Sequence, residues 1–298
     1  MGRDGVDSFL TCVMRRSEND GVITVGSVLL LMIVIPVIVY GVCLFLLLIA
    51  SDSGAYSLDM VTSDDFVAVA VFSSIISALV VYRMMDSYNG HKKRDLVWTS
   101  SLIAYAKSYG HDVSGLESAA AQLSTDKSEL VTKILMVYAV IISIIHLILC
   151  FLGMTGVMDL GNINTVVSVM SLGSFILMTI AASLVFIYSR RHNNLQCEFS
   201  RQWTEVMKDE FPGMAPMEIP MFFKKLWPHL ILVVITFGLY SYILVMISVH
   251  GLNTHVFKQW TYETNLLNAI RDKEGATGYE VVAKDYGTGI NSLVKRMF

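Results

Sequence analysis

Histidine and cysteine side chains have the widest chemical range in this sequence, because both ligate metals and both change protonation state near neutral pH. His146 and Cys150 are one helical turn apart inside a long apolar run, so they share a face. The pair offers two metal ligands or a proton relay. No third ligand is identifiable nearby, and the favoured interpretation is a neutral histidine bonded to a neighbouring helix, with Cys150 as a small apolar filler.

Further histidines lie in polar segments: His91, His111, His192 and His255. No pair has the His-x-x-x-His spacing of a metalloprotease helix, and no glutamate accompanies one in that arrangement. The sequence therefore predicts no metal site and no cofactor. Asn89 with His91, and Asn253 with His255, are interpreted as groups that bond exposed backbone or contact lipid headgroups. A ligand or partner site is the alternative.

The apolar runs lack the groups that catalysis or ion coupling needs. The bare runs at 25–50, 66–82, 134–157, 163–188 and 226–249 contain no Asp, Glu, Lys or Arg, which argues against an ion-coupled transporter and against paired catalytic aspartates. Ser73 and Ser77 would line a polar pathway, but such hydroxyls more often bond the i−4 carbonyl or let helices approach closely. We predict that the protein is not an enzyme.

Long apolar runs dominate the sequence. Apolar residues make up 54% of it and charged residues 16%, against about 25% charged in soluble domains. Each run approaches the roughly 20 residues that a helix needs to cross a bilayer. We therefore predict transmembrane spans at about 25–50, 66–84, 131–157 and 163–189, and a fifth membrane segment at about 226–249.

The basic residues predict an orientation. Residues 51–65, between the first two spans, contain four Asp and no Lys or Arg. Because Lys and Arg are retained in the cytoplasm, the sequence predicts a multi-pass cell-membrane protein with a cytoplasmic N-terminus. Gly238 lies near the middle of the fifth segment. A plain span, which we favour, places the C-terminus outside, whereas a hairpin bent at Gly238 returns it to the cytoplasm.

A short pattern recurs after the second, fourth and fifth segments. Its copies are Asn89-x-His91-x-x-Arg94, Gln196-x-Glu198-x-x-Arg201-Gln202-Trp203 and Asn253-x-His255-x-x-Lys258-Gln259-Trp260. Each copy opens an amphipathic helix, which predicts an all-α protein of two duplicated transmembrane hairpins plus a fifth segment. The predicted units are 1–24, 25–130, 131–225 and 226–298. Contact candidates for lipid or a partner are Asn89, His91, Arg94, Arg201, Gln202, Trp203, Asn253, His255, Lys258 and Trp260.

Thr236-Phe237-Gly238-Leu239-Tyr240, followed by Leu252-Asn253-Thr254-His255 and Lys258-Gln259, resembles the signature of a family of small prokaryotic membrane domains of unknown function. Its members carry Thr-x-Gly-Ile-Tyr and then Leu-Asn-x-His. The resemblance covers residues 227–267, and the second aromatic cluster expected after Tyr240 is thinner here. The family implies a prokaryotic membrane protein but supplies no reaction or ligand.

The function predicted from these features is a non-catalytic membrane scaffold or regulatory subunit. Its basic, amphipathic helices would engage lipid headgroups or a protein partner, and nucleic acid is not expected as a partner. One alternative is an oligomeric channel or passive transporter for small solutes, with Ser73, Ser77 and His146 on its path. Another is an accessory subunit of a larger membrane complex.

Overall fold

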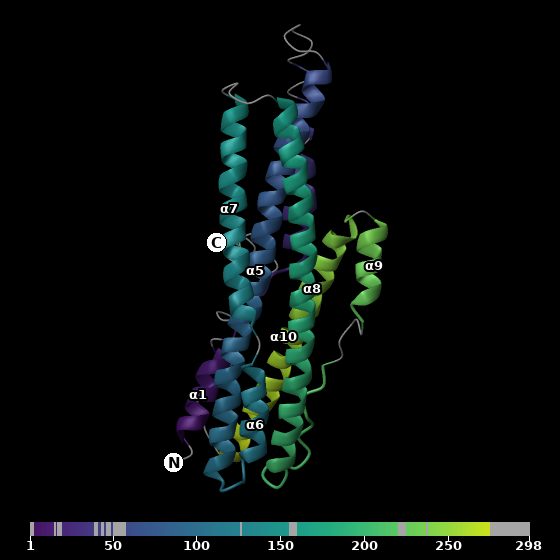
Figure 1. Ribbon diagram of the computed structural model, residues 1–298. Helices are drawn as coiled ribbons and strands as arrows, with labels where there is room; N and C mark the ends of the chain where they lie inside the picture. Colours follow the sequence, from purple (N-terminus) through teal and green to yellow (C-terminus); the bar gives the residue numbers. More distant parts are fainter. Residues whose placement is uncertain are drawn as a thin grey trace.

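The computed structural model describes residues 3–14, 16, 20–38, 41–42, 45, 49, 58–125, 127–154, 160–219, 225–236 and 238–274. Every regular element in these ranges is helical, which confirms the predicted all-α class. The elements are α1 (Arg3–Met14), α3 (Val25–Leu29), the π-helix η1 (Leu30–Val34), α5 (Leu58–Ser108), α6 (Ser114–Leu123), α7 (Ser128–Met154), α8 (Leu160–Val206), α9 (Trp227–Ile235) and α10 (Tyr240–Glu274) (Figure 1).

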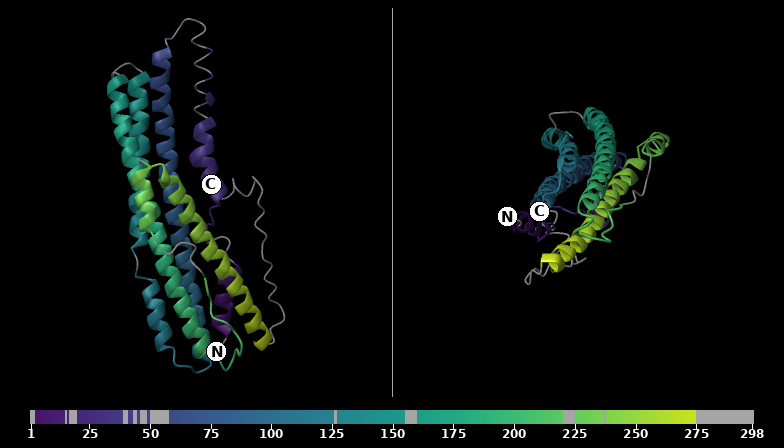
Figure 2. Two further views of the ribbon diagram at one scale, coloured as in Figure 1. Left: turned by 90° about the vertical axis from the view of Figure 1, so that its right-hand side faces the viewer. Right: turned by 90° about the horizontal axis from the view of Figure 1, so that it is seen from below.

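Long helices form the body of the protein. α5 has 51 residues and α8 has 47, which correspond to about 75 and 70 Å at 1.5 Å per residue. α5 packs on α7 and α8, and α10 packs obliquely on α8 (Figure 2). α5, α8 and α10 run in the same direction, so their C-terminal halves lie together at one end of the bundle (Figure 1).

Two clusters of buried apolar side chains hold these helices together. The first apolar cluster comprises Val28, Met32, Val80, Val81, Met84, Met85, Leu135, Met178, Ala181, Ala182, Val185, Leu244, Val245 and Val249. The second includes Trp98, Leu102, Phe199, Trp203, Leu266 and Ile270, with Phe9 of α1. On α5, α8 and α10 alike, buried polar residues lie between the two clusters, beside a smaller apolar cluster of Val22, Tyr88, Leu252, Val256 and Trp260. The bundle therefore contains a polar layer between two apolar ones.

The predicted membrane architecture is contradicted. Among the helices of the described ranges, none is both long enough and apolar enough to span a membrane. The transmembrane hairpins, the multi-pass topology and the cell-membrane localisation with a cytoplasmic N-terminus are therefore corrected. The physical reason for the error is that an apolar run also suits a helix that packs on several neighbours. Val81 and Val185 are buried in this way between helices.

The predicted amphipathic helices are not separate from the apolar runs. α5 continues from the run at 66–84 through Lys107, and α8 continues from the run at 163–189 through Trp203. The amphipathic helix predicted after the fourth segment has its apolar face inward: Phe199, Trp203 and Met207 are fully buried and Val206 is partly buried. The boundaries expected at the ends of the runs therefore lie inside continuous helices.

The fifth segment bends at Gly238. α9 ends at Ile235 and α10 begins at Tyr240. Gly238 has φ 91°, a left-handed conformation that glycine adopts without a Cβ clash. Thr236 Oγ1 accepts a hydrogen bond from the Tyr240 amide at 2.9 Å, which closes the turn. The single straight helix favoured from the sequence is therefore wrong, and the bent alternative describes the backbone.

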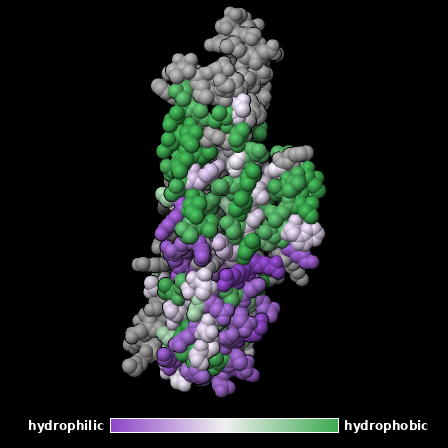
Figure 3. All heavy atoms as spheres, in the orientation of Figure 1, coloured by the Kyte–Doolittle hydropathy of each residue, from purple (hydrophilic) through white to green (hydrophobic). Residues whose placement is uncertain are grey.

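Apolar side chains are also exposed on part of the surface. In the view of Figure 3 they gather over the upper parts of α7 and α8 and over α9, whereas polar side chains cover the opposite end. On α7 the exposed residues include Ile134, Val137, Ile141, Ile144 and Ile148. These faces take no part in the packing of the described helices on one another.

We expect Trp203→Ala to lower the free energy of unfolding by about 3–5 kcal/mol. The indole is fully buried, donates from Nε1 to the Leu102 carbonyl at 3.1 Å and stacks on Phe211. Denaturant titration followed by circular dichroism would measure the loss. The matched control is Trp227→Ala, because Trp227 is 59% exposed and should change stability by about 0.5 kcal/mol or less. Equal effects of the two substitutions would contradict this packing.

Candidate metal centre

Four buried side chains from three helices converge in the polar layer. His91 and Asp95 come from α5, His192 from α8 and His255 from α10. One potential ligand atom of each lies within 4.8 Å of those of the others. The three imidazole rings form a triangle with centroid separations of 5.0, 5.7 and 5.8 Å. All four residues are at most 2% exposed.

Local sequence explains why each helix presents its polar groups to this point. His91 and Asp95, His192 and Gln196, and His255 and Gln259 are each four residues apart. Residues at i and i+4 lie on the same helix face. Because α5, α8 and α10 run in the same direction, the three pairs reach the same level of the bundle.

The Asp95 carboxylate is the centre of the hydrogen bonding. Its Oδ2 contacts His192 Nε2 at 2.6 Å and accepts from Gln196 Nε2 at 2.5 Å, and its Oδ1 accepts from Gln259 Nε2 at 2.5 Å. Burial favours the neutral acid, but the charge of His91 and the hydrogen bonds from His192 and His91 outweigh it. The pKa of Asp95 is therefore well below its usual value, and the group is an anion.

Two histidines are held by partners on the outer side of their rings. His255 Nδ1 lies 2.8 Å from Asn193 Oδ1, and Asn193 Nδ2 donates to the Ile219 carbonyl at 3.2 Å. That second bond directs the amide oxygen toward His255, so Nδ1 carries the proton and Nε2 keeps its lone pair. His91 Nδ1 lies 3.0 Å from Asp20 Oδ1. Metal-ligating histidines are oriented by partners of these kinds.

Three atoms in the layer are buried acceptors without a hydrogen-bond partner: His255 Nε2, Gln196 Oε1 and Gln259 Oε1. His91 Nε2 lies 3.1 Å from Asp95 Oδ2 and forms an ion pair with that carboxylate when the imidazole is protonated. A buried acceptor without a donor costs about 1–3 kcal/mol. The layer is therefore rich in lone pairs, and a cation would satisfy them.

Charged groups surround the four side chains. Arg94 donates to Asp20 at 2.6 Å and to Glu263 at 2.6 Å, and lies 3.4 Å from Asp95. Burial opposes its charge, but the three carboxylates raise the pKa of Arg94 well above its usual value. Burial raises the pKa of Glu263, with Arg94 opposing. A buried charge persists only when it is paired in this way.

The donor set suits a divalent transition metal. Three imidazole nitrogens and one carboxylate oxygen match the ligands of Zn²⁺, which bonds to both at about 2.0–2.2 Å. Tetrahedral bonding at those lengths places ligand atoms about 3.3 Å apart. Contacts of 2.6 and 3.1 Å already join Asp95 to His192 and His91. The ligand atom of His255 lies within 4.8 Å of the others.

The structure places the predicted contact residues in two groups. Asn89, His91, Arg94, Trp203, His255 and Trp260 are buried, whereas Lys258 and the Arg201 side chain are exposed. Arg201 pairs with Glu198 at 2.9 Å, and Gln202 donates to Glu198 at 3.2 Å. Asn253 donates to the Ile23 carbonyl at 2.6 Å, the backbone role expected for it. Burial prevents the first group from forming a contact surface, because their polar atoms face other helices.

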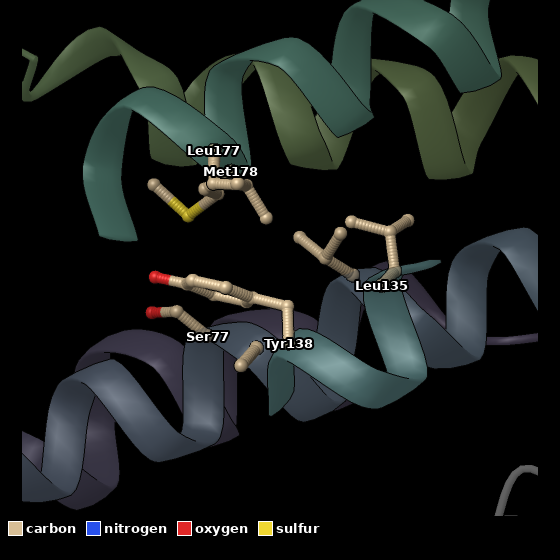
Figure 4. A pocket seen from close by; sticks show the side chains of 7 residues that line it. Ser77, Leu135, Tyr138, Leu177 and Met178 are labelled. Atoms are coloured by element: carbon tan, nitrogen blue, oxygen red, sulfur yellow. The ribbon is translucent and has the colours of Figure 1, made fainter. Parts of the chain in front are cut away.

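Ser73 and Ser77 do not line an open path in the described ranges. Ser73 is half-buried and Ser77 is 7% exposed. Ser77 borders a cavity of about 10 Å³ between α5, α7 and α8, together with Leu135, Tyr138 and Met178 (Figure 4). That volume holds about one water molecule. His146 and Cys150 belong to α7, but their side chains lie outside the described part.

Six residues of this layer were not predicted from the sequence as members of one site: Asp20, Asp95, His192, Gln196, Gln259 and Glu263. Ligand pairs were expected along a single helix, whereas the four candidate ligands come from three helices. A signal was present: the spacing His-x-x-x-Asp/Gln occurs at 91–95, 192–196 and 255–259. Part of the recurring pattern lies in this layer, because its three copies contain His91, Gln196 and His255.

No family model, curated protein or solved structure matches the chain. The resemblance of residues 227–267 to a prokaryotic membrane-domain family stays a prediction.

The protonation of His91 predicts a pH dependence of stability in the presence of a chelator. Burial disfavours the imidazolium, but Asp95 and Asp20 outweigh it and raise the pKa of His91 to about 9 from 6.5. The stabilisation is complete below about pH 6.5 and is lost as the pH rises through 9. We expect the free energy of unfolding to fall across this window by up to about 3 kcal/mol.

Denaturant titrations at several pH values would measure this fall, with His91→Gln as the comparison. His255 does not interfere, because burial and the charges of His91 and His192 lower its pKa and confine its effect to acidic pH. An equally steep fall in His91→Gln would contradict the assignment.

Proposed function

We propose that this protein binds a divalent transition-metal ion, with Zn²⁺ as the best-fitting ion, through His91, Asp95, His192 and His255. The observation that carries the proposal is the convergence of three imidazoles and a carboxylate from three helices within 4.8 Å in a fully buried layer. Hydrogen bonds within the protein leave His255 Nε2 without a partner, and this supports the assignment.

The proposed ion has a structural role. Structural zinc sites have four protein ligands, whereas catalytic sites keep one position for water or substrate. Here the protein supplies four ligands, and each is at most 2% exposed. An ion at this point would join α5, α8 and α10 at one level of the bundle. This role agrees with the prediction that the protein is not an enzyme, which itself stays a prediction.

The predicted scaffold role fits such a protein, because an ion-bound helical bundle presents a fixed surface. Arg201 and Lys258 remain exposed beside the layer and are the members of the predicted contact set available to a partner. The channel and accessory-subunit alternatives stay predictions, and no observation on the described residues favours either.

We expect the chelator-treated protein to bind one Zn²⁺ per chain in isothermal titration calorimetry. His192→Gln and His255→Gln should weaken binding by more than about 100-fold, since second-shell changes alone cost 10–100-fold. The matched control is His250→Gln, because His250 lies on α10 with His255 but is exposed. Zn²⁺ at 100 times its Kd should raise the free energy of unfolding by about 2.7 kcal/mol.

Co²⁺ provides a second measurement, because bound Co²⁺ absorbs visible light according to its ligands. The wild-type protein and His250→Gln should give the same spectrum, and His192→Gln should not. Failure of the wild-type chain to bind Zn²⁺, or equal binding by all three variants, would contradict the proposed function.

A further inference from the structure

The N-terminal segment, defined here as α1, Arg16 and Asp20, is attached to the helices that hold the candidate metal centre. Phe9, Cys12 and Val13 of α1 are buried in the second apolar cluster. The Cys12 thiol donates to the Arg94 carbonyl at 3.5 Å. Arg16 donates to the Trp260 carbonyl at 2.9 Å and to Thr264 Oγ1 at 3.0 Å. The segment therefore contacts both α5 and α10.

Asp20 brings a carboxylate from this segment into the polar layer. It is fully buried and is contacted by three donors, His91 Nδ1 at 3.0 Å, Arg94 Nε at 2.6 Å and Trp260 Nε1. A turn follows at Gly21, whose φ of 49° suits glycine. Ser87 Oγ contacts the carbonyls of Asp20 and Gly21 at 3.1 and 2.8 Å. Asp20 is thus held by hydrogen bonds to both its main-chain carbonyl and its side-chain carboxylate.

The bond to Asp20 determines which nitrogen of His91 faces the other ligands. With Nδ1–H donated to Asp20, Nε2 lies 3.1 Å from Asp95 Oδ2 and on the side of the other imidazoles. Among the described residues, Asp20 is the hydrogen-bond partner of Nδ1, so the ring orientation depends on a group that is 71 residues away in sequence. When the N-terminal segment leaves, His91 loses this orientation.

We infer that Asp20 is a positioning residue for His91, and that metal binding and attachment of the N-terminal segment are thereby coupled. The inference rests on the metal binding proposed above. Loss of a second-shell carboxylate weakens metal affinity by about 10–100-fold. Coupling between two binding events is reciprocal. The ion therefore favours the attached segment by the same factor, and detachment of the segment releases the ion more readily.

Cys12 reports the attachment without any mutation of the layer. It is 5% exposed, and burial raises the pKa of its thiol to about 12, so the attached segment does not react with maleimide. The experiment measures alkylation by N-ethylmaleimide residue by residue with mass spectrometry, in chelator and in Zn²⁺. We expect Zn²⁺ to slow Cys12 alkylation by about 10–100-fold.

Two controls separate coupling from other effects of zinc. Cys197 is half-buried on α8 and lines a surface pocket with Arg201 and Pro216, to which the N-terminal segment contributes no lining residue among those described, so its alkylation rate should not change with Zn²⁺. In His192→Gln, Zn²⁺ should no longer protect Cys12, which excludes direct blocking of the thiol by the ion. Protection that persists in His192→Gln would overturn the inference.

Substitutions at Asp20 test its positioning role. Asp20→Ala should weaken Zn²⁺ binding about 10–100-fold and alter the Co²⁺ spectrum. Asp20→Asn retains an acceptor for His91 Nδ1 and should restore part of the affinity, which a purely structural role of the segment does not predict. If the wild-type chain binds Zn²⁺ while Cys12 alkylation is unchanged, the coupling is wrong and the proposed function stands. If it binds no Zn²⁺, both fail.

Discussion

The structure depends on the burial of one carboxylate, that of Asp95. A buried anion is tolerated only when charges and hydrogen bonds replace the water it has lost. Asp95 obtains these partners from His192 and Gln196 on α8 and from Gln259 on α10, in addition to His91 on its own helix. Because these partners come from α5, α8 and α10, the three helices must meet at the level of Asp95.

This requirement also fixes how the long helices lie against one another. Apolar packing on either side of the layer tolerates several alignments of similar volume. A slide of α8 by one turn, about 5.4 Å, would remove His192 and Gln196 from Asp95 and leave the charge without its donors. The polar layer therefore specifies the register, whereas the two apolar clusters provide most of the burial.

The same layer gives the protein its candidate chemistry. An arrangement that only neutralised Asp95 would need no further acceptors, yet three acceptor atoms are buried there without partners, His255 Nε2, Gln196 Oε1 and Gln259 Oε1. A metal ion bound to these atoms would supply their missing partners, and the layer would then be a binding site. Since Asp20 and Arg16 extend the layer to the N-terminal segment, occupancy of the site and the position of α1 become parts of one equilibrium.

The sequence by itself determined the helical class and the region of the site. Apolar periodicity predicted helices, and the recurring pattern around residues 89–94, 196–203 and 253–260 marked the level at which three of them meet. The length of the apolar runs was interpreted as evidence of membrane spans. Run length depends on composition alone and does not show whether other helices cover an apolar face. It also favoured one straight helix at 226–249, although the chain bends at Gly238.

Only the tertiary structure decided which polar residues act together. His91, His192 and His255 are separated by 101 and 63 positions, so no spacing along one helix relates them. Their meeting requires that α5, α8 and α10 run in the same direction at one level. Asp20 lies in the layer because the chain turns at Gly21. The local sequence does not determine which helix this turn places Asp20 against. Helix faces follow from local spacing, whereas ligand sets follow from how the helices pack.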